Sequence, residues 1–243
     1  MAKTEKWIEC VGDGKSPARR IVVKYIGGYK TGKGSDLLMH GNSMDGKLRQ
    51  SKWQKDPRNK NVGEKGSDMW PAWTWTNYLY HDNVRVCMMS DNIHANLTEA
   101  ASRISAGGKA TFSSIFAGGF ICDQAYSAVV VAGHEVLMKD VKKMLMNDRE
   151  FEAHMKFAEE QGFELFVKPV AVGKKKHTRV RPRFPDWEVQ FTASIFDDRI
   201  TNKVLEQVFF EAGSIGLGDW RTSNKNMRPG QYGHFTAMFR AVD

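Results

Sequence analysis

The part of the chain best suited to chemistry is a run of positive charge in its last third. Seven basic residues and no acidic residue lie in this run, which comprises Lys168, Lys174, Lys175, Lys176, Arg179, Arg181 and Arg183. Closely spaced cationic side chains attract the phosphates of a nucleic acid. The alternative interpretation is a strand edge whose charges only prevent pairing with another sheet.

A second candidate is the glycine-rich segment GSIGLGDWR, in which Gly216 and Gly218 precede Trp220 and Arg221. Glycine lets a backbone approach a phosphate closely, and successive N–H groups can hold an anion. We therefore expect the two glycines to cradle a phosphate, Arg221 and Lys225 to add charge, and Trp220 to stack on a base. The alternative is a helix C-terminus followed by a turn.

Three kinds of element must position these residues. The basic run predicts a hairpin with its turn near Gly173 and Lys174. A strand is predicted over 187–195, where apolar and polar residues alternate strictly. A helix capped by Thr201 and stopped by Gly213 follows, and then a last strand. These two strands and the helix that connects them are expected to form a right-handed βαβ unit. The strands and the helix are short, which suits a ferredoxin-like fold.

The rest of the chain also alternates short strands and helices. Strands are predicted at 6–11, 20–26, 84–89 and 128–132, and helices from Ser90 to Gly107, over 139–147 and over 149–161. The expected class is α+β, with a ferredoxin-like (RRM-like) antiparallel sheet core, helices on one face and long inserted loops. No linker rich in proline or serine divides the chain, so we expect a single domain over residues 1–243.

Residues 41–70 are predicted to be a basic loop insertion. They are rich in basic residues, contain Pro57 and show almost no apolar periodicity. Lys52 and Lys55 flank Trp53, so this loop could grip a nucleic-acid strand by charge and stacking; a solvated insertion is the alternative. Trp73, in the aromatic segment that follows, is another candidate for stacking, although such clusters more often belong to a core.

Composition narrows the function classes. The chain has 243 residues and a net charge of +8, which favours nucleic acid or another polyanion as its partner. Its three cysteines are dispersed, so we expect free thiols in a reducing compartment such as the cytoplasm. The first residues lack the apolar segment of a signal peptide, and no apolar run is long enough to span a membrane.

The sequence lacks the usual signatures of catalysis and cofactor binding. None of its seven histidines is spaced as a metal ligand from a cysteine, an aspartate or a second histidine, so we expect no metal and no cofactor. The segment GGKAT lacks the first glycine and the hydroxyl residue of a nucleotide-binding loop. A lone histidine such as His40, His81 or His177 could still serve acid–base catalysis on RNA. A binding protein is the default, and enzyme activity stays open.

Three features resemble the RAMP superfamily of CRISPR effector proteins. The segment VCMMSDNIHANLTEAASRISAGGKATFSSIF resembles its strand–Ser–helix element, and the expected ferredoxin-like core with inserted loops is similar. Residues 213–218, followed by Tyr232-Gly233-His234-Phe235, resemble its C-terminal glycine loop. The resemblance implies that a backbone-type subunit binds a strand like a CRISPR RNA and stacks head to tail. The chain departs from the superfamily by lacking a clear set of nuclease residues.

The chain is also similar to a family of tailed-bacteriophage proteins. The likeness lies in LLMHG at 37–41, in RVRPRFPDW at 179–187, and in GLGDWR with YGHF. It covers most of the chain and carries no activity over. It implies a phage-encoded protein in the host cytoplasm, with other phage or CRISPR-like subunits as further partners.

The leading hypothesis is a non-catalytic protein that binds single-stranded RNA or DNA and assembles along it as a homo-oligomer, without contact to a membrane. One alternative is a metal-independent RAMP-like endoribonuclease that uses a histidine and the glycine loop. A second is a structural protein of the phage virion or its assembly, which would form a fixed assembly without nucleic acid.

Overall fold

The computed structural model describes residues 19–39, 75–147, 150–172, 175–222 and 230–242, together with Leu48, Ser51, Lys52, Lys55 and Pro57. Side chains at 146–147 and 169–179 are not part of that description. The strand predicted at 6–11 and nearly all of the basic insertion predicted at 41–70 therefore lie outside the described residues.

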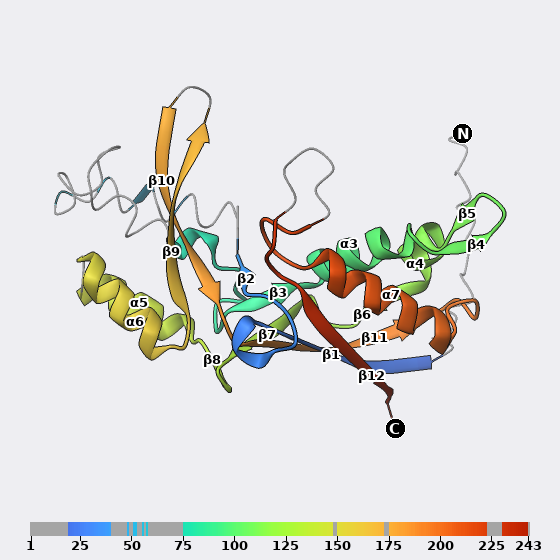
Figure 1. Ribbon diagram of the computed structural model, residues 1–243. Helices are drawn as coiled ribbons and strands as arrows, with labels where there is room; N and C mark the ends of the chain where they lie inside the picture. Colours follow the sequence, from blue (N-terminus) through green and yellow to red (C-terminus); the bar gives the residue numbers. More distant parts are fainter. Residues whose placement is uncertain are drawn as a thin grey trace, which may run out of the picture.

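A large antiparallel sheet forms the centre of the molecule (Figure 1). Among the described residues it has seven strands, namely β1 (Arg19–Gly27), β3 (Cys87–Met89), β6 (Phe120–Cys122), β7 (Tyr126–Val131), β8 (His134–Glu135), β11 (Trp187–Ile195) and β12 (Phe235–Ala241). The order is β12-β1-β11-β7-β3, with β6 on β11 and β8 on β7. Because β11 and β12 both run antiparallel to β1 between them, they are parallel to each other.

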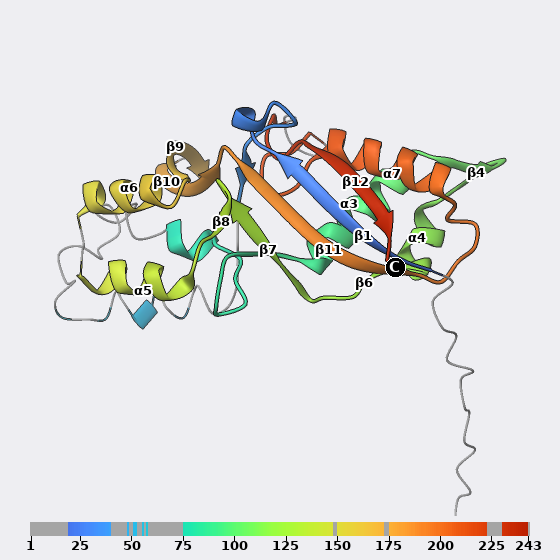
Figure 2. The same cartoon turned by 90° about the horizontal axis from the view of Figure 1, so that it is seen from below.

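Helices cover one face of this sheet (Figures 1 and 2). They are α3 (Ser90–Ala101), α4 (Ser113–Gly119) and α7 (Asn202–Ile215). The core lies between these helices and the sheet. Tyr25, fully buried on β1, stacks on Phe235 with ring centroids 4.1 Å apart and meets Phe191 edge-on at 5.2 Å. The prediction of an α+β class with antiparallel sheet is confirmed.

The strand predicted over 187–195 is confirmed as β11. Trp187, Val189 and Phe191 are buried on the helix side, and the residues between them are more exposed. Ser194 departs from the alternation and is buried on the other side, where its hydroxyl donates to an Asp123 carboxylate oxygen at 2.7 Å.

The helix after β11 begins as predicted and ends later. The Thr201 side chain accepts a hydrogen bond from the Val204 N–H at 3.3 Å. The helix continues to Ile215, and Gly216 caps it with a φ of 84°. Gly213, predicted as the stop, lies inside α7, where an added Cβ would lie 2.2 Å from the Phe235 carbonyl oxygen. Glycine is needed there because α7 packs directly against the backbone of β12.

The other boundaries also differ from the sequence-based expectations. Helix α3 begins at Ser90 without a side-chain cap and ends at Ala101, so Gly107 does not end it. Residues around Gly107 instead form a small hairpin of β4 (Ser105–Gly107) and β5 (Ala110–Thr111). The helices predicted over 139–147 and 149–161 are present as α5 (Met138–Asn147) and α6 (Phe151–Glu160).

The predicted basic hairpin is present but belongs to a second, smaller sheet. Strands β9 (Glu164–Val172) and β10 (Lys175–Phe184) pair antiparallel, and β2 (Leu37–Leu38) adds to the base of β10. The hairpin projects from the body of the molecule (Figure 1). Two short 3₁₀ helices, η1 (Tyr29–Thr31) and η3 (Trp75–Tyr78), complete the described elements. No described helix has both the length and the apolar character needed to cross a bilayer.

Candidate nucleic-acid interface

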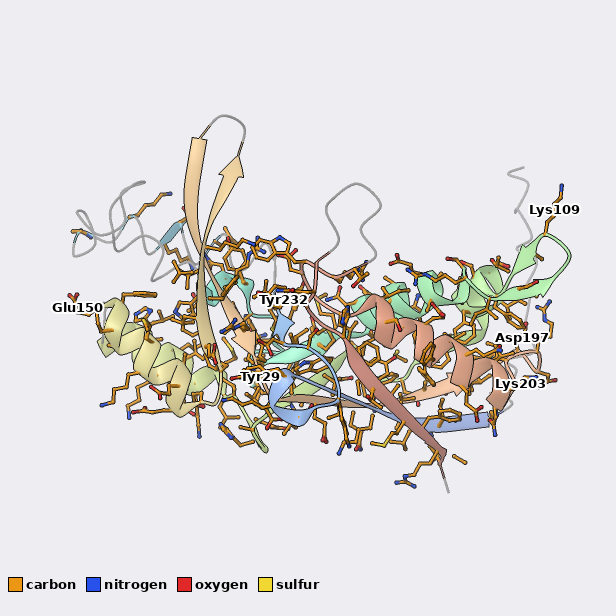
Figure 3. All side chains as sticks on the ribbon, viewed as in Figure 1. Tyr29, Lys109, Glu150, Asp197, Lys203 and Tyr232 are labelled. Carbon is orange, nitrogen blue, oxygen red and sulfur yellow. The ribbon has the colours of Figure 1, made fainter. Side chains whose placement is uncertain are left out.

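The β9–β10 hairpin, the end of α7 and the start of the last strand meet at one place, which we call the hairpin junction. We define it by Phe166, Lys168, Arg181, Arg183, Asp219, Trp220 and Tyr232. Figure 3 places Tyr232 in the middle of the molecule, between the foot of the hairpin and α7. Residues more than 60 positions apart in the sequence thus come together here.

Arg181 is anchored inside the junction. Its side chain is 6% exposed and forms an ion pair with Asp219. Its guanidinium carbon lies 4.5 Å from the centre of the Trp220 ring and 5.8 Å from that of Tyr78. A buried guanidinium that already has a carboxylate partner is a structural element of the site, and it holds the Trp220 ring in place.

Arg183 is likewise engaged at the foot of the hairpin. It pairs with Glu164 across the strands, and its Nε lies 3.6 Å from an Asp36 carboxylate oxygen. Burial lowers the pKa of Arg183, but the hydrogen bond and charge of Glu164 and the charge of Asp36 raise it overall. Burial raises the pKa of Asp36, and the Tyr29 N–H and the Arg183 charge offset part of this shift. The guanidinium therefore stays charged and locally neutralised.

The other basic residues of the run lie further out on the hairpin. Lys168 is exposed, and its ammonium nitrogen lies 4.0 Å above the Trp220 ring centre. The strand register places Lys168 opposite Arg179, and Lys175 and Lys176 pair in register with Val172 and Ala171. The side chains of these last three basic residues, and all of Lys174, lie outside the description.

Trp220 is the aromatic centre of the junction. It is partly exposed, and its backbone has a φ of 52°, a left-handed value that few side-chain-bearing residues adopt. Its ring centroid lies 6.1 Å from that of Phe166 and 6.2 Å from that of Tyr232. Two aromatic neighbours and two cations surround the indole, and its partial exposure leaves part of the residue open to solvent. An indole in cationic surroundings is typical of side chains on which bases stack.

The glycine segment positions Trp220 through its backbone. The Leu217 N–H donates to the Gly233 carbonyl at 2.9 Å, and the Asp219 N–H donates to the Leu38 carbonyl at 2.8 Å. An added Cβ on Gly218 would lie 2.4 Å from that same Leu38 oxygen. Gly216 caps α7. This geometry corresponds to the alternative interpretation, a helix end and a tight turn, because these N–H groups already bind protein carbonyls instead of facing a phosphate.

The remaining predicted contacts do not gather at the junction. Arg221 turns toward α3, where its Nη2 lies 3.3 Å from a Glu99 carboxylate oxygen. Lys52 and Lys55 are exposed. Trp53 and Lys225 lie outside the described residues. Of the predicted site residues, the structure thus brings together Trp220, Arg181 and Arg183, with the glycines supporting them.

Several junction residues were not singled out as site residues from the sequence. Phe166 lies opposite Arg181 in the register, and Tyr232 lies beside Trp220. Asp219 lies between Gly218 and Trp220 in the sequence, so its location near the predicted site could be read from the sequence. Its ion pair with Arg181 could not, because Arg181 lies 38 residues earlier on another element. Acidic residues in the same segment as a predicted basic site could have shown that part of the charge is neutralised.

Known RRM-type sheets bind RNA through aromatic residues on their open face. The open face of the main sheet is the side away from the helices, seen in Figure 2. Of the strand positions described on that face, Tyr126 at the rim is the only aromatic one. The central positions of β1 and β11 hold aliphatic, charged and amide side chains such as Val22, Lys24 and Gln190. The cluster of partly exposed aromatic side chains that the structure describes at the junction therefore lies off the main sheet.

The described residues offer little for metal or thiol chemistry. No group of three His, Cys, Asp or Glu side chains among them could hold a metal ion. Burial, with a smaller contribution from Asp82, raises the pKa of Cys87 to about 12. Burial and the Asp123 charge raise the pKa of Cys122 to about 12. Both thiols therefore stay protonated at neutral pH and are poor nucleophiles.

The chain matches no model of a known protein family, and a search of curated protein sequences likewise gives no match.

Proposed function

We propose that the protein is a non-catalytic binder of single-stranded RNA or DNA, with the β9–β10 hairpin holding phosphates and Trp220 stacking on a base. The observation that carries the proposal is the partly exposed Trp220 ring at the foot of a strongly basic hairpin, with Lys168 Nζ 4.0 Å and Arg181 Cζ 4.5 Å from its centre. Stacking does not depend on base identity, and a flexible single strand exposes its bases. The net charge of +8 supports a polyanionic partner.

The basic residues have two different roles in this proposal. Arg181 and Arg183 keep the junction in shape, because both are paired with carboxylates. Lys168, Lys174, Lys175, Lys176 and Arg179 supply the phosphate contacts. On β10, Arg179 lies two residues and Lys175 six residues nearer to the turn than Arg181. The hairpin would thus lead a strand from its tip down to Trp220.

The proposal includes a ferredoxin-like (RRM-like) core. The strand order β12-β1-β11-β7 supports it, and so does the position of α3 and α7 on one face of the sheet (Figure 1). In the sequence, α3 lies between β1 and β7, and α7 lies between β11 and β12. It also includes the phage origin and the assembly along a strand that the resemblances imply, for which the likeness in 37–41 and 179–187 is the support.

One contact favours a second candidate, the metal-independent endoribonuclease. The His234 Nε2 lies 2.7 Å from the Thr222 hydroxyl, next to the glycine segment and Trp220. A histidine beside bound RNA could take the proton of a 2′-hydroxyl. This candidate predicts cleavage of single-stranded RNA in EDTA and its loss in His234→Ala. Intact RNA after long incubation would remove it.

The test of the binding proposal is an anisotropy titration of labelled ~40-nucleotide single strands, a length above the site size of ~4–16 nucleotides. Trp220→Ala is expected to weaken binding about 5- to 150-fold, because one base–aromatic stack contributes ~1–3 kcal/mol. Phe210→Ala, which removes an aromatic ring exposed on α7, is the matched control and should leave binding unchanged. Equal affinities for the wild type and Trp220→Ala would exclude Trp220 from the site.

A further inference from the structure

The open face of the main sheet exposes apolar side chains on both sides of a polar row that β11 contributes. Its exposed or partly exposed apolar side chains come from four strands and comprise Val22, Ile26, Ile121, Tyr126, Ala128, Val130 and Met238. Ile121, Tyr126 and Met238 are each more than 40% exposed. No described helix or loop packs over the centre of this face (Figure 2). An uncovered sheet face with this many exposed apolar side chains marks an interaction surface.

Two pairs of opposite charge lie on this face. Lys24 and Glu188 lie on the adjacent central strands, with Nζ and Oε1 2.5 Å apart. Arg20 and Asp123 form a second pair at 2.8 Å. These pairs leave the centre of the face with little net charge in a chain whose total is +8. A nucleic acid gains little from such a surface, because its affinity depends on unneutralised cations.

A second copy of the chain suits this surface. Two copies of a basic protein repel each other, and the repulsion is least where the surface is neutral. In a two-fold contact each patch meets itself, so it must be complementary to itself. An axis between β1 and β11 would place Lys24 against the partner's Glu188, and the reverse, with the apolar side chains packed around them.

We infer that the protein forms a two-fold dimer through this open sheet face. The dimer forms without nucleic acid and leaves both hairpin junctions exposed, because the junction lies off the main sheet. The inference does not rest on the proposed function. It would hold for a protein that binds no nucleic acid at all.

The first test measures the mass of the nuclease-treated full chain by size exclusion with light scattering. The wild type should show twice the mass of one chain, and Met238→Asp should shift it to the monomer. Phe210→Asp, the matched control on α7, should stay dimeric. A monomeric wild type, or a dimer that only Phe210→Asp dissociates, would overturn the inference.

A charge exchange makes the test specific to the two-fold geometry. Lys24→Glu and Glu188→Lys alone should each weaken the dimer by ~10-fold or more, because like charges then face each other across the axis. Mixing the two single variants should restore the dimer, since each new charge meets an opposite one on the other copy. A mixture as monomeric as its components would contradict the geometry, and circular dichroism of each variant checks that it folds.

The same variants distinguish the other occupant of this face. Under the inference, Met238→Asp retains the affinity of one chain for a short single strand. If Met238→Asp instead abolished nucleic-acid binding while the mass of the wild type stayed that of one chain, nucleic acid would be the occupant and the dimer would be excluded.

Discussion

The hairpin junction and the open sheet face both contain ion pairs, but in different surroundings. At the junction, Arg181 is buried against Trp220 and pairs with Asp219, while the exposed Lys168 lies over the same ring. On the open face, Lys24 and Glu188 are each about one-third exposed and neutralise each other among aliphatic side chains. An ion pair thus lies beneath a cationic, aromatic surface at the junction. On the open face, an ion pair lies within a neutral surface that carries aliphatic side chains. The surroundings determine which partner each surface suits.

The largest expected difference between the two regions is in stability. Asp219→Ala leaves the buried Arg181 without its carboxylate and should lower the free energy of unfolding by ~3 kcal/mol, the low end of what breaking a buried pair costs. In the monomeric Met238→Asp background, where no second copy covers the face, Glu188→Ala removes a partner that is about one-third exposed and should cost less than ~1 kcal/mol. Urea unfolding of both variants makes the comparison, and equal losses would show that Arg181 is not structurally anchored.

A smaller difference is expected in how stability changes as the pH falls. An aspartate of one region should add stability in acid, and an aspartate of the other should lose it. Burial raises the pKa of Asp36 at the junction above its ordinary 3.8. As the pH falls from neutral through that raised pKa, the folded state takes up a proton before the unfolded state does, so Asp36 adds stability. Stability of the wild type relative to Asp36→Asn should therefore rise as the pH falls toward 4.

Asp123 on the open face should behave in the opposite way. Burial alone would raise its pKa, but hydrogen bonds from Arg20, Ser194 and Thr192 hold the pKa below 3.8. Its stabilising effect is present above pH 3.8 and is lost as the pH falls below that value. The stability of the wild type relative to Asp123→Asn should therefore fall as the pH falls. If the free energy of unfolding changed with pH in the same direction for both aspartates, the difference between the two regions would be excluded.

The sequence allowed the prediction of features that depend on local pattern. The strict alternation over 187–195 gave β11, and the hydroxyl of Thr201 gave the start of α7. The hairpin between 164 and 184 followed from its turn and its charges. The role of Gly213 did not follow, because its cause is the carbonyl of Phe235 on a strand 22 residues later.

The candidate site was less accessible to prediction for the same reason. Arg181 and Arg183 are indistinguishable from the other basic residues in the sequence, and only the fold brings Asp219, Glu164 and Asp36 to them. The open sheet face was not recognised because its apolar residues come from four strands spread over more than 200 positions. Local alternation marks which residues share a face but gives no indication of which faces combine.

The most direct test of the central claim is the salt dependence of single-strand binding. For the wild type and for the triple variant Lys174→Ala, Lys175→Ala, Lys176→Ala, the logarithm of the binding constant would be plotted against the logarithm of the salt concentration. Each phosphate contact contributes ~0.7 to the slope for a single strand, so the triple variant should have a slope shallower by about 2. An unchanged slope would contradict the account and remove the hairpin from the nucleic-acid site.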